Sequence, residues 1–307
     1  MKRIARIIAL FLVLSALVLA QRRFGGGRGG FGGRGGSEGT DDVTWTEGGR
    51  VMIGPEVRTP RELDSHSTGT PIWMNPRPFE KDVFTFVRVR RGRASGTSGG
   101  NWATDTPDSD LNLSYRLQQM TSMRTSPDGR FIRLTDEDLS EHPFIYMVEP
   151  GTLSLTELEI LALRKYLLNG GFLMLDDFWG DSEWTNAEAV LKRVLPDRSI
   201  TELSLDHPLY HCVFEIKTKG QVPNYRQGIR SQYDGVTWEE YHDGDVRTVH
   251  HRVITDDKGR LMVMATHNTD NGDGWEREGE SDYYFHNFSE KISYPLGINI
   301  IFYTMTH

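Results

Sequence analysis

Two apolar runs joined by one helix-like segment constrain the fold of this chain more than any other feature. The first run, PFIYMVEPG (residues 143–151), ends in a Pro-Gly turn, and the second, FLMLDD, covers residues 172–177. Continuous apolar runs bounded by turn residues are typical of strands buried on both faces. The segment between them, SLTELEILALRKYLLNGG (residues 154–171), has apolar residues at helical spacing and ends in Gly-Gly. Together these segments predict a right-handed strand–helix–strand crossover in a parallel sheet.

The strand and helix pattern continues on either side of this unit. Ser154 and Glu157 have capping-box spacing, so we expect the central helix to begin at Ser154. A turn is expected at Asp257–Gly259, and Pro295 predicts the start of a largely buried C-terminal helix. Residue composition predicts further strands at 84–90, 207–216, 246–254 and 261–267, and further helices at 111–123, 184–196 and 294–305. This alternation predicts one α/β domain, residues 81–307, with helices on both faces of its sheet.

The overall charge and the cysteine content exclude two classes of protein. The chain has 307 residues, a formal charge of −8 and a single cysteine, Cys212. An acidic chain lacks the basic face of a nucleic-acid binder, so we expect no nucleic-acid partner. One cysteine cannot form an internal disulfide, so stability must come from a packed core.

The first 80 residues differ in composition from the predicted domain. Residues 1–20 have a basic start, an apolar run and small residues near the end, as in a secretory signal peptide. The alternative is an uncleaved anchor, which would be the only membrane contact, but the run is shorter than a bilayer span. Residues 21–40 are a Gly/Arg-rich segment predicted to be a disordered leader, and residues 41–80 either add a strand or wrap the surface. We therefore expect a periplasmic or secreted protein.

Polar loops rich in tryptophan follow the predicted strands. Ligands of open parallel sheets bind beyond the carboxyl ends of the strands, because the loops converge there where the strand order reverses. Tryptophans beside carboxylates are typical of pockets that stack a sugar ring, and equally of loops pinned to the core by a large ring. Trp184 lies in these loops, and the predicted ligand-binding residues are Trp102, Asp105, Trp179, Glu183, Asp270, Asp273, Trp275, Glu276 and Arg277.

Two aspartates end the second apolar run. Asp176 and Asp177 leave a buried strand, so burial would raise the pKa of one of them and suit it to general acid or base work. His267 ends another predicted strand and is the nearest candidate partner. We therefore predict that Asp176, Asp177 and His267 are catalytic. The alternative is that one aspartate caps the following helix and the other pairs with an arginine.

The stretch TDNGDGWEREGE (residues 269–280) partly matches a calcium loop. Thr269 stands where the motif needs a carboxylate, and a strand rather than a helix precedes the loop. The places that do match are occupied by Asn271, Asp273, Gly274 and Glu280. The match is incomplete, and we predict no bound metal or other cofactor.

A histidine pair and the single cysteine also fit simpler structural roles. His207 and His211 have the spacing of a helical zinc pair, but Pro208 opposes helical geometry there, so packing or capping is expected. Cys212 lies in an apolar setting, as is typical of a buried, unreactive thiol.

Several long blocks resemble the bacterial domain-of-unknown-function family numbered 4159. The resemblance covers about residues 82–307 and rests on PFIYMVEPG, LRKYLLNGGFLMLDDFWG, RVLPDRSITELSLDHPLYHCVFEI, HNTDNGDGWERE and YPLGINIIFYTMTH, in this order. It implies a domain similar to the class I glutamine amidotransferase superfamily, above all its trehalose-utilisation-like branch, and hence a flavodoxin-like open parallel sheet. Amidotransferases place a nucleophilic cysteine in the turn where this chain has Asp177 or Phe178. Without that thiolate no thioester forms, so we expect no glutaminase activity.

Two functional hypotheses follow, since the family itself has no established activity. The first is an exported protein that binds a polar small molecule or glycan, such as a carbohydrate, at the strand-end crevice and, if catalytic, hydrolyses it. The second is a non-catalytic scaffold that has lost its nucleophile and docks a protein partner in the cell envelope.

Overall fold

The computed structural model describes residues 42–46, 49–79, 82–91 and 102–307. The chain divides into two units between Thr40 and Asp41, and every described residue lies in the second unit, Asp41–His307. The predicted signal peptide and Gly/Arg-rich leader lie outside the described residues. Among the helices that are described, none combines the length and the apolar character needed to cross a bilayer.

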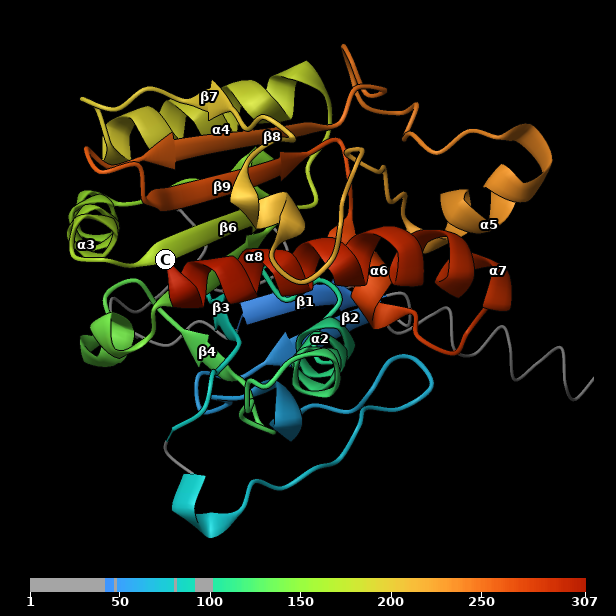
Figure 1. The fold of residues 1–307 in the computed structure, drawn as a ribbon, viewed down its shortest axis with the longest axis horizontal. Coiled ribbons are helices and arrows are strands. Elements are labelled where there is room, and N and C mark those ends of the chain that lie inside the picture. Colours follow the sequence, from blue (N-terminus) through green and yellow to red (C-terminus); the bar gives the residue numbers. More distant parts are fainter. Residues whose placement is uncertain (1–41, 47–48, 80–81, 92–101) are drawn as a thin grey trace, which may run out of the picture. The chain divides into compact units, whose positions relative to one another are not determined.

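A seven-stranded, mostly parallel sheet forms the centre of the second unit (Figure 1). Its strand order is β4-β3-β5-β6-β9-β8-β7. The first five strands are parallel, β8 pairs antiparallel with β9, and β7 pairs antiparallel with β8. The chain adds β4 on one side of β3 and β5 on the other, so the strand order reverses between β3 and β5. The strands are β3 Val87–Val89, β4 Arg130–Ile132, β5 Phe144–Val148, β6 Phe172–Asp176, β7 Thr201–Glu202, β8 His250–Thr255 and β9 Leu261–His267.

Helices cover both faces of this sheet, as the sequence predicts. Helices α3 (Glu157–Leu168) and α4 (Gly180–Val194) pack on one face, and α2 (Asp108–Met120) and α8 (Tyr294–Thr306) pack on the other. The other helical elements that follow β3 in the described chain are η3 Glu137–Glu141, η4 Pro150–Thr152, η5 Pro208–His211, α5 Tyr225–Asp234, α6 Asn271–Glu276, α7 Asp282–Tyr284 and the π-helical η6 Phe285–Ser293. Both layers are needed because the central strands are apolar on both sides.

Strand β5 shows how the sequence specifies this two-sided burial. Successive side chains of a strand point to opposite faces. Phe144 and Tyr146 accordingly pack with α2 and α8, whereas Ile145 and Met147 pack with α3 and α4. All four are fully buried. A one-residue slip in register would therefore move each side chain to the other face, where it would not pack against the helices.

The central crossover forms as predicted, but α3 begins at Glu157, and its capping residue is Thr156 instead of Ser154. β5 and β6 are adjacent and parallel, with α3 between them in the chain. The capping box uses Thr156 and Glu159, whose carboxylate accepts a hydrogen bond from the Thr156 amide at 2.8 Å, instead of Ser154 and Glu157. Leu155 is buried in the core, and the backbone is still extended at Thr156.

The strand predicted at 207–216 is wrong. Residues Pro208–His211 form the short helix η5 and no strand follows in this stretch. Pro208 lacks a backbone donor, and the amides of Val213 and Phe214 donate to the side chain of Asn299 in α8 at 3.3 and 2.8 Å. A side chain from a distant helix therefore takes the hydrogen bonds that a neighbouring strand would supply.

Residues 42–79 both add strands and wrap the domain. β1 (Asp42–Thr46) and β2 (Gly49–Ile53) form a separate antiparallel pair. The following stretch contains η1 (Pro60–Glu62) and η2 (Arg77–Phe79), and its Arg58 carbonyl accepts a hydrogen bond from the amide of Phe131 at 2.7 Å.

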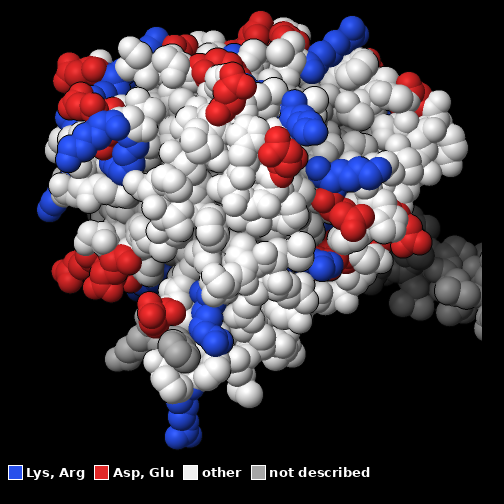
Figure 2. Space-filling view, viewed as in Figure 1, with Lys and Arg blue, Asp and Glu red and all other residues white. Residues whose placement is uncertain are grey.

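The face of the molecule seen in Figure 2 carries acidic and basic side chains of both signs. They are interspersed over much of this face, and a broad area left of its centre is uncharged. No stripe of a single sign runs across the face shown.

Candidate functional site

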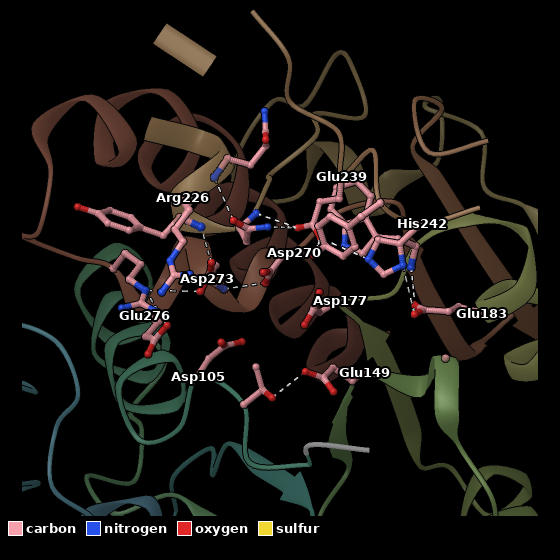
Figure 3. A pocket seen from close by; sticks show the side chains of 18 of the residues that line it. Asp105, Glu149, Asp177, Glu183, Arg226, Glu239, His242, Asp270, Asp273 and Glu276 are labelled. Carbon is pink, nitrogen blue, oxygen red and sulfur yellow. Dashed lines mark hydrogen bonds and ion pairs between the residues drawn. The ribbon is translucent and has the colours of Figure 1, made fainter. Parts of the chain in front are cut away.

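A cavity of about 760 Å³ lies at the carboxyl ends of the parallel strands. Its walls come from the loops after β3, β5, β6 and β9, from α5 and α6, and from the segment after α5 (Figure 3). Eight carboxylates contribute to the lining: Asp105, Glu149, Asp177, Glu183, Glu239, Asp270, Asp273 and Glu276. Three arginines, Arg226, Arg230 and Arg277, also line it. The cavity is therefore polar and strongly acidic.

Four non-glycine residues after these strands have left-handed backbone conformations. The φ angles are 65° at Asp105, 48° at Glu149, 58° at Asp177 and 62° at Asn268. Positive φ is uncommon outside glycine, and such residues tend to cluster at functional sites. Three of the four are carboxylates that line the cavity. Most of the non-glycine residues with a strained backbone in the described chain therefore lie at the cavity.

The two adjacent aspartates after β6 have opposite environments. Asp176 is fully buried and accepts hydrogen bonds from Tyr146 (3.0 Å), Thr266, Asn271 (2.8 Å) and the Gly272 amide (3.1 Å). It therefore ties β6 to β5, β9 and the first turn of α6, and it does not line the cavity.

Asp177 points into the cavity (Figure 3). Within the described part of the chain its carboxylate accepts no hydrogen bond and pairs with no arginine. Burial, and then the neighbouring carboxylates Glu149 and Asp105, raise its pKa well above the ordinary value. Of the two aspartates predicted to be catalytic, Asp177 therefore lines the cavity. Asp176 does not, and its hydrogen bonds give it a structural role.

Asp105 and Asp270 share this acidic environment. Burial and then Asp273 raise the pKa of Asp105, and burial and then Asp177 raise that of Asp270. Asp270 also caps α6, accepting a hydrogen bond from the Asp273 amide at 2.8 Å. Carboxylates from three different loops thus face one another across the floor of the cavity.

A second group of carboxylates lies beside Arg277. The Nε atom of Arg277 is 2.8 Å from Glu276 and 3.5 Å from Asp273. Burial raises the pKa of Asp273 although Arg277 opposes the change, and burial followed by Asp105 raises that of Glu276. Arg277 therefore offsets part of the negative charge of Asp273 and Glu276, and to a smaller extent that of Asp105.

His242 forms a bridge between two carboxylates at another wall of the cavity. Its Nδ1 is 3.3 Å from Glu183 and its Nε2 is 3.4 Å from Glu239, and its ring stacks on Trp179. Burial disfavours the charged imidazolium, but the hydrogen bonds to Glu183 and Glu239 outweigh burial and raise the pKa of His242 to about 9. We therefore assign a positive charge to this histidine at neutral pH.

Only one of the predicted tryptophans lines the cavity, namely Trp179. Trp275 is fully buried against Phe86 and Tyr146 in the core. Trp102 is also buried, with its ring edge-on to Phe131 at 5.0 Å. Trp184 packs under Arg252, whose guanidinium carbon lies 3.9 Å from the ring centroid. The predicted roles of Trp102 and Trp275 in ligand binding are therefore wrong, because these rings pin the loops to the core.

His267 is placed away from the cavity lining, so it is not the partner of Asp177 that the sequence predicts. The side chain is buried, with Nε2 2.9 Å from the Gly180 carbonyl and Nδ1 2.8 Å from Arg252. Burial lowers the pKa of His267 to about 4. A neutral ring whose two nitrogens are both engaged serves the packing between β9 and the start of α4.

The calcium loop considered at residues 269–280 does not form. Residues Asn271–Glu276 are already helical, Asn271 binds Asp176, and Glu280 pairs with Arg277 at 3.2 Å. The side chains that would bind calcium in this motif therefore have separate partners and do not converge on one point.

The histidine pair has the packing and capping roles expected of it, and the cysteine, predicted to be buried, is half-buried. His207 caps η5, accepting from the Leu209 amide at 3.2 Å, and His211 contacts the Leu205 carbonyl at 2.8 Å. Burial raises the pKa of the Cys212 thiol, which disfavours the reactive thiolate.

Sequence reasoning missed several residues of the cavity. The segment WEEYHDGD (residues 238–245) contributes Glu239, Tyr241 and His242, and α5 contributes further polar side chains. Glu149 was also missed, although it directly follows a predicted strand. The mixture of acids and aromatic residues in WEEYHDGD is the same signal that identified the other loops.

We expect the His242 ring to titrate with a pKa of about 9, measurable by NMR of the imidazole protons. The folded pKa exceeds the unfolded value of about 6.5, so the histidine's stabilising effect is complete below pH 6.5 and is lost as the pH rises through about 9. Urea unfolding should show this loss between pH 6.5 and 9.5, and His242→Gln should remove it. A measured pKa at or below 6.5 would contradict the bridge to Glu183 and Glu239.

Comparison with known proteins gives a family but no characterised relative. No curated protein matches the chain. The sequence model of a family described as a domain of unknown function (DUF4159) matches residues 85–305, which contain the whole seven-stranded sheet and every residue that lines the cavity except His66. The chain therefore belongs to the DUF4159 family.

Proposed function

We propose that this protein is an exported binding protein for a polar, hydroxyl-rich ligand such as a carbohydrate, and that the acidic cavity is its binding site. The observation that carries this proposal is the position of eight carboxylates, three of them on strained backbone, in one cavity at the strand ends. The signal-like start of the sequence supports export to the periplasm or the medium.

The position of the cavity supports ligand binding. The five parallel strands, numbered in chain order, are arranged 2-1-3-4-5, an order found in flavodoxin-like sheets. Such sheets bind ligands at the carboxyl ends next to the point where the strand order reverses. Thr104 and Asp105 after β3, and Glu149 after β5, lie on the two sides of that point and line the cavity. The volume of about 760 Å³ is also in the usual range of small-molecule sites.

The chemistry of the lining indicates the class of ligand. Carboxylate oxygens accept hydrogen bonds from hydroxyl and amino groups. Asn224, Gln227 and Tyr241 add further polar groups to the lining, although their donors already bond within the protein. Eight carboxylates against three arginines disfavour an anionic ligand. A neutral or amino-bearing sugar fits this lining better than a phosphate or a uronic acid.

The turn after β6 supports a hydrolytic role for Asp177. We infer an amidotransferase-like scaffold in which Asp177 replaces the nucleophilic cysteine of that superfamily. A sharp, strained turn from strand to helix exposes the nucleophile in several hydrolase folds. Asp177 lies in such a turn with φ 58°, and Gly180 completes it where an added Cβ would lie 2.1 Å from the Asp243 carbonyl oxygen. We assign to Asp177 the removal of a proton from an attacking water.

Binding to three soluble oligosaccharides of different charge tests the ligand class. We expect neutral cello-oligosaccharides or cationic chitosan oligosaccharides to raise the melting temperature of the protein, and anionic oligogalacturonate to leave it unchanged. Glu239→Gln should weaken this binding, whereas Glu290→Gln, an exposed carboxylate outside the cavity, should not. Binding of oligogalacturonate alone would contradict the proposal.

Hydrolysis is measured separately, as release of new reducing ends from the sugar that binds. A general base contributes about 10²- to 10⁴-fold, so Asp177→Asn should lower turnover by about that factor. Equal turnover in the variant and the wild type would remove Asp177 from the reaction. No binding of any oligosaccharide, combined with co-purification of one stoichiometric envelope protein, would favour the scaffold hypothesis.

A further inference from the structure

Two overlapping groups of carboxylates in the cavity have the geometry of cation ligands. Asp105, Asp177 and Asp270 each offer one oxygen atom, and these atoms lie within 4.8 Å of one another. Asp105, Asp273 and Glu276 form a second group by the same measure. Carboxylates at such distances repel one another when ionised, unless a cation lies between them. Oxygen ligands of this kind are those preferred by Ca²⁺, Mg²⁺ and Mn²⁺.

Asp105, which belongs to both groups, provides an independent indication of a ligand. Its side chain is 9% exposed, and its Oδ2 atom is buried without a hydrogen-bond donor. Buried polar atoms of proteins are almost always satisfied, and an exception calls for an explanation such as a bound ion. Figure 3 shows the Asp105 side chain directed into the space between Asp177 and the Asp273–Glu276 side of the cavity.

The charges around the two groups differ. Arg277 lies 2.8 Å from Glu276 and 3.5 Å from Asp273, so the second group already has a cationic partner. Among the residues that the structure describes, no arginine or lysine pairs with Asp177 or Asp270. Negative charge is therefore least compensated at Asp177 and Asp270, whereas Asp105, which both groups share, is also influenced by Arg88 and Arg277.

We propose that Asp105, Asp177 and Asp270 bind one divalent cation of the Ca²⁺, Mg²⁺ and Mn²⁺ class. The three ligands come from the loops after β3, β6 and β9, so the cation would hold together the ends of three parallel strands. Its other coordination positions face the cavity, where water or ligand hydroxyl groups complete the shell. The absence of histidine and cysteine from the group disfavours zinc.

This inference extends beyond the proposed binding of a sugar, because the metal is measured directly and without that sugar. The full chain is treated with a chelator and titrated with CaCl₂, MgCl₂ and MnCl₂ at constant ionic strength. Isothermal calorimetry measures the stoichiometry, and electron paramagnetic resonance measures free Mn²⁺. We expect one cation per chain and a melting temperature that rises with cation concentration.

Two variants locate the site. Removing a group that only hydrogen-bonds to a metal ligand weakens metal binding by about 10- to 100-fold. Removing the charge of a direct ligand, as in Asp177→Asn, should therefore weaken binding by roughly 100-fold or more. Glu276→Gln removes a carboxylate from the other group and should change the affinity by less than about threefold. Circular dichroism verifies that both variants are folded.

Three results would overturn the assignment. One is the absence of binding of all three cations to the wild-type protein. Another is unchanged binding by Asp177→Asn. The third is a larger loss in Glu276→Gln than in Asp177→Asn, which would place the cation beside Arg277 instead. Failure to bind oligosaccharides leaves these readouts unaffected, so the two proposals fail separately.

Discussion

Replacing Asp110 with asparagine is expected to lower the free energy of unfolding by about 3–5 kcal/mol, because it leaves the charge of Arg88 buried without its partner. Both side chains of this ion pair have no exposed surface. Arg88 Nε lies 3.0 Å from each carboxylate oxygen of Asp110, and Arg88 Nη1 donates to the carbonyl of Thr104 at 2.8 Å. The pair therefore joins β3 to α2 and also fixes the loop that carries Asp105.

A double variant and an exposed pair serve as controls for this prediction. Replacing both partners with apolar residues, as in Arg88→Met with Asp110→Leu, should cost far less than the single change, since no charge remains buried. Asp138→Asn removes a partly exposed pair with Arg130 and should cost less than about 1 kcal/mol. Urea unfolding measures all three. A loss below 1 kcal/mol in Asp110→Asn would show that the buried charge is compensated by other groups.

Replacing the adjacent aspartates Asp176 and Asp177 by asparagine is expected to change the free energy of unfolding in opposite directions. Asp176 accepts four hydrogen bonds, and an amide group in its place would direct N–H donors at existing donors. We expect Asp176→Asn to cost roughly 2–4 kcal/mol. Asp177 faces other carboxylates, so Asp177→Asn should raise the stability of the chelator-treated protein by roughly 1 kcal/mol, as often seen when a functional group is removed.

Urea unfolding of the two variants, side by side at pH 7 with chelator, tests this contrast. Both substitutions exchange one oxygen for a nitrogen at neighbouring positions, so each variant is the control for the other. If Asp177→Asn destabilised the protein as much as Asp176→Asn, the view of Asp177 as an uncompensated carboxylate would be wrong.

Much of the acidic site could be recognised in the sequence. The carboxylates Asp105, Asp177, Asp270, Asp273 and Glu276 follow strands that the apolar runs identify, and the carboxyl ends of parallel strands meet at one edge of a sheet. The same reasoning failed for Trp102 and Trp275. A tryptophan in such a loop can turn to the ligand or to the core, and composition does not distinguish the two.

The sequence by itself determined the parallel crossover from β5 to β6, the helices on both faces and the strand ends at which polar residues gather. These features are local, because apolar periodicity and turn residues specify them over a few residues. Only the tertiary structure decided which polar groups compensate one another. Asp176 and Asp177 are neighbours in the chain, yet one meets donors from β5, β9 and α6 while the other meets Glu149 and Asp105. Electrostatic compensation depends on distances between segments up to about a hundred residues apart, and only the folded packing fixes those distances.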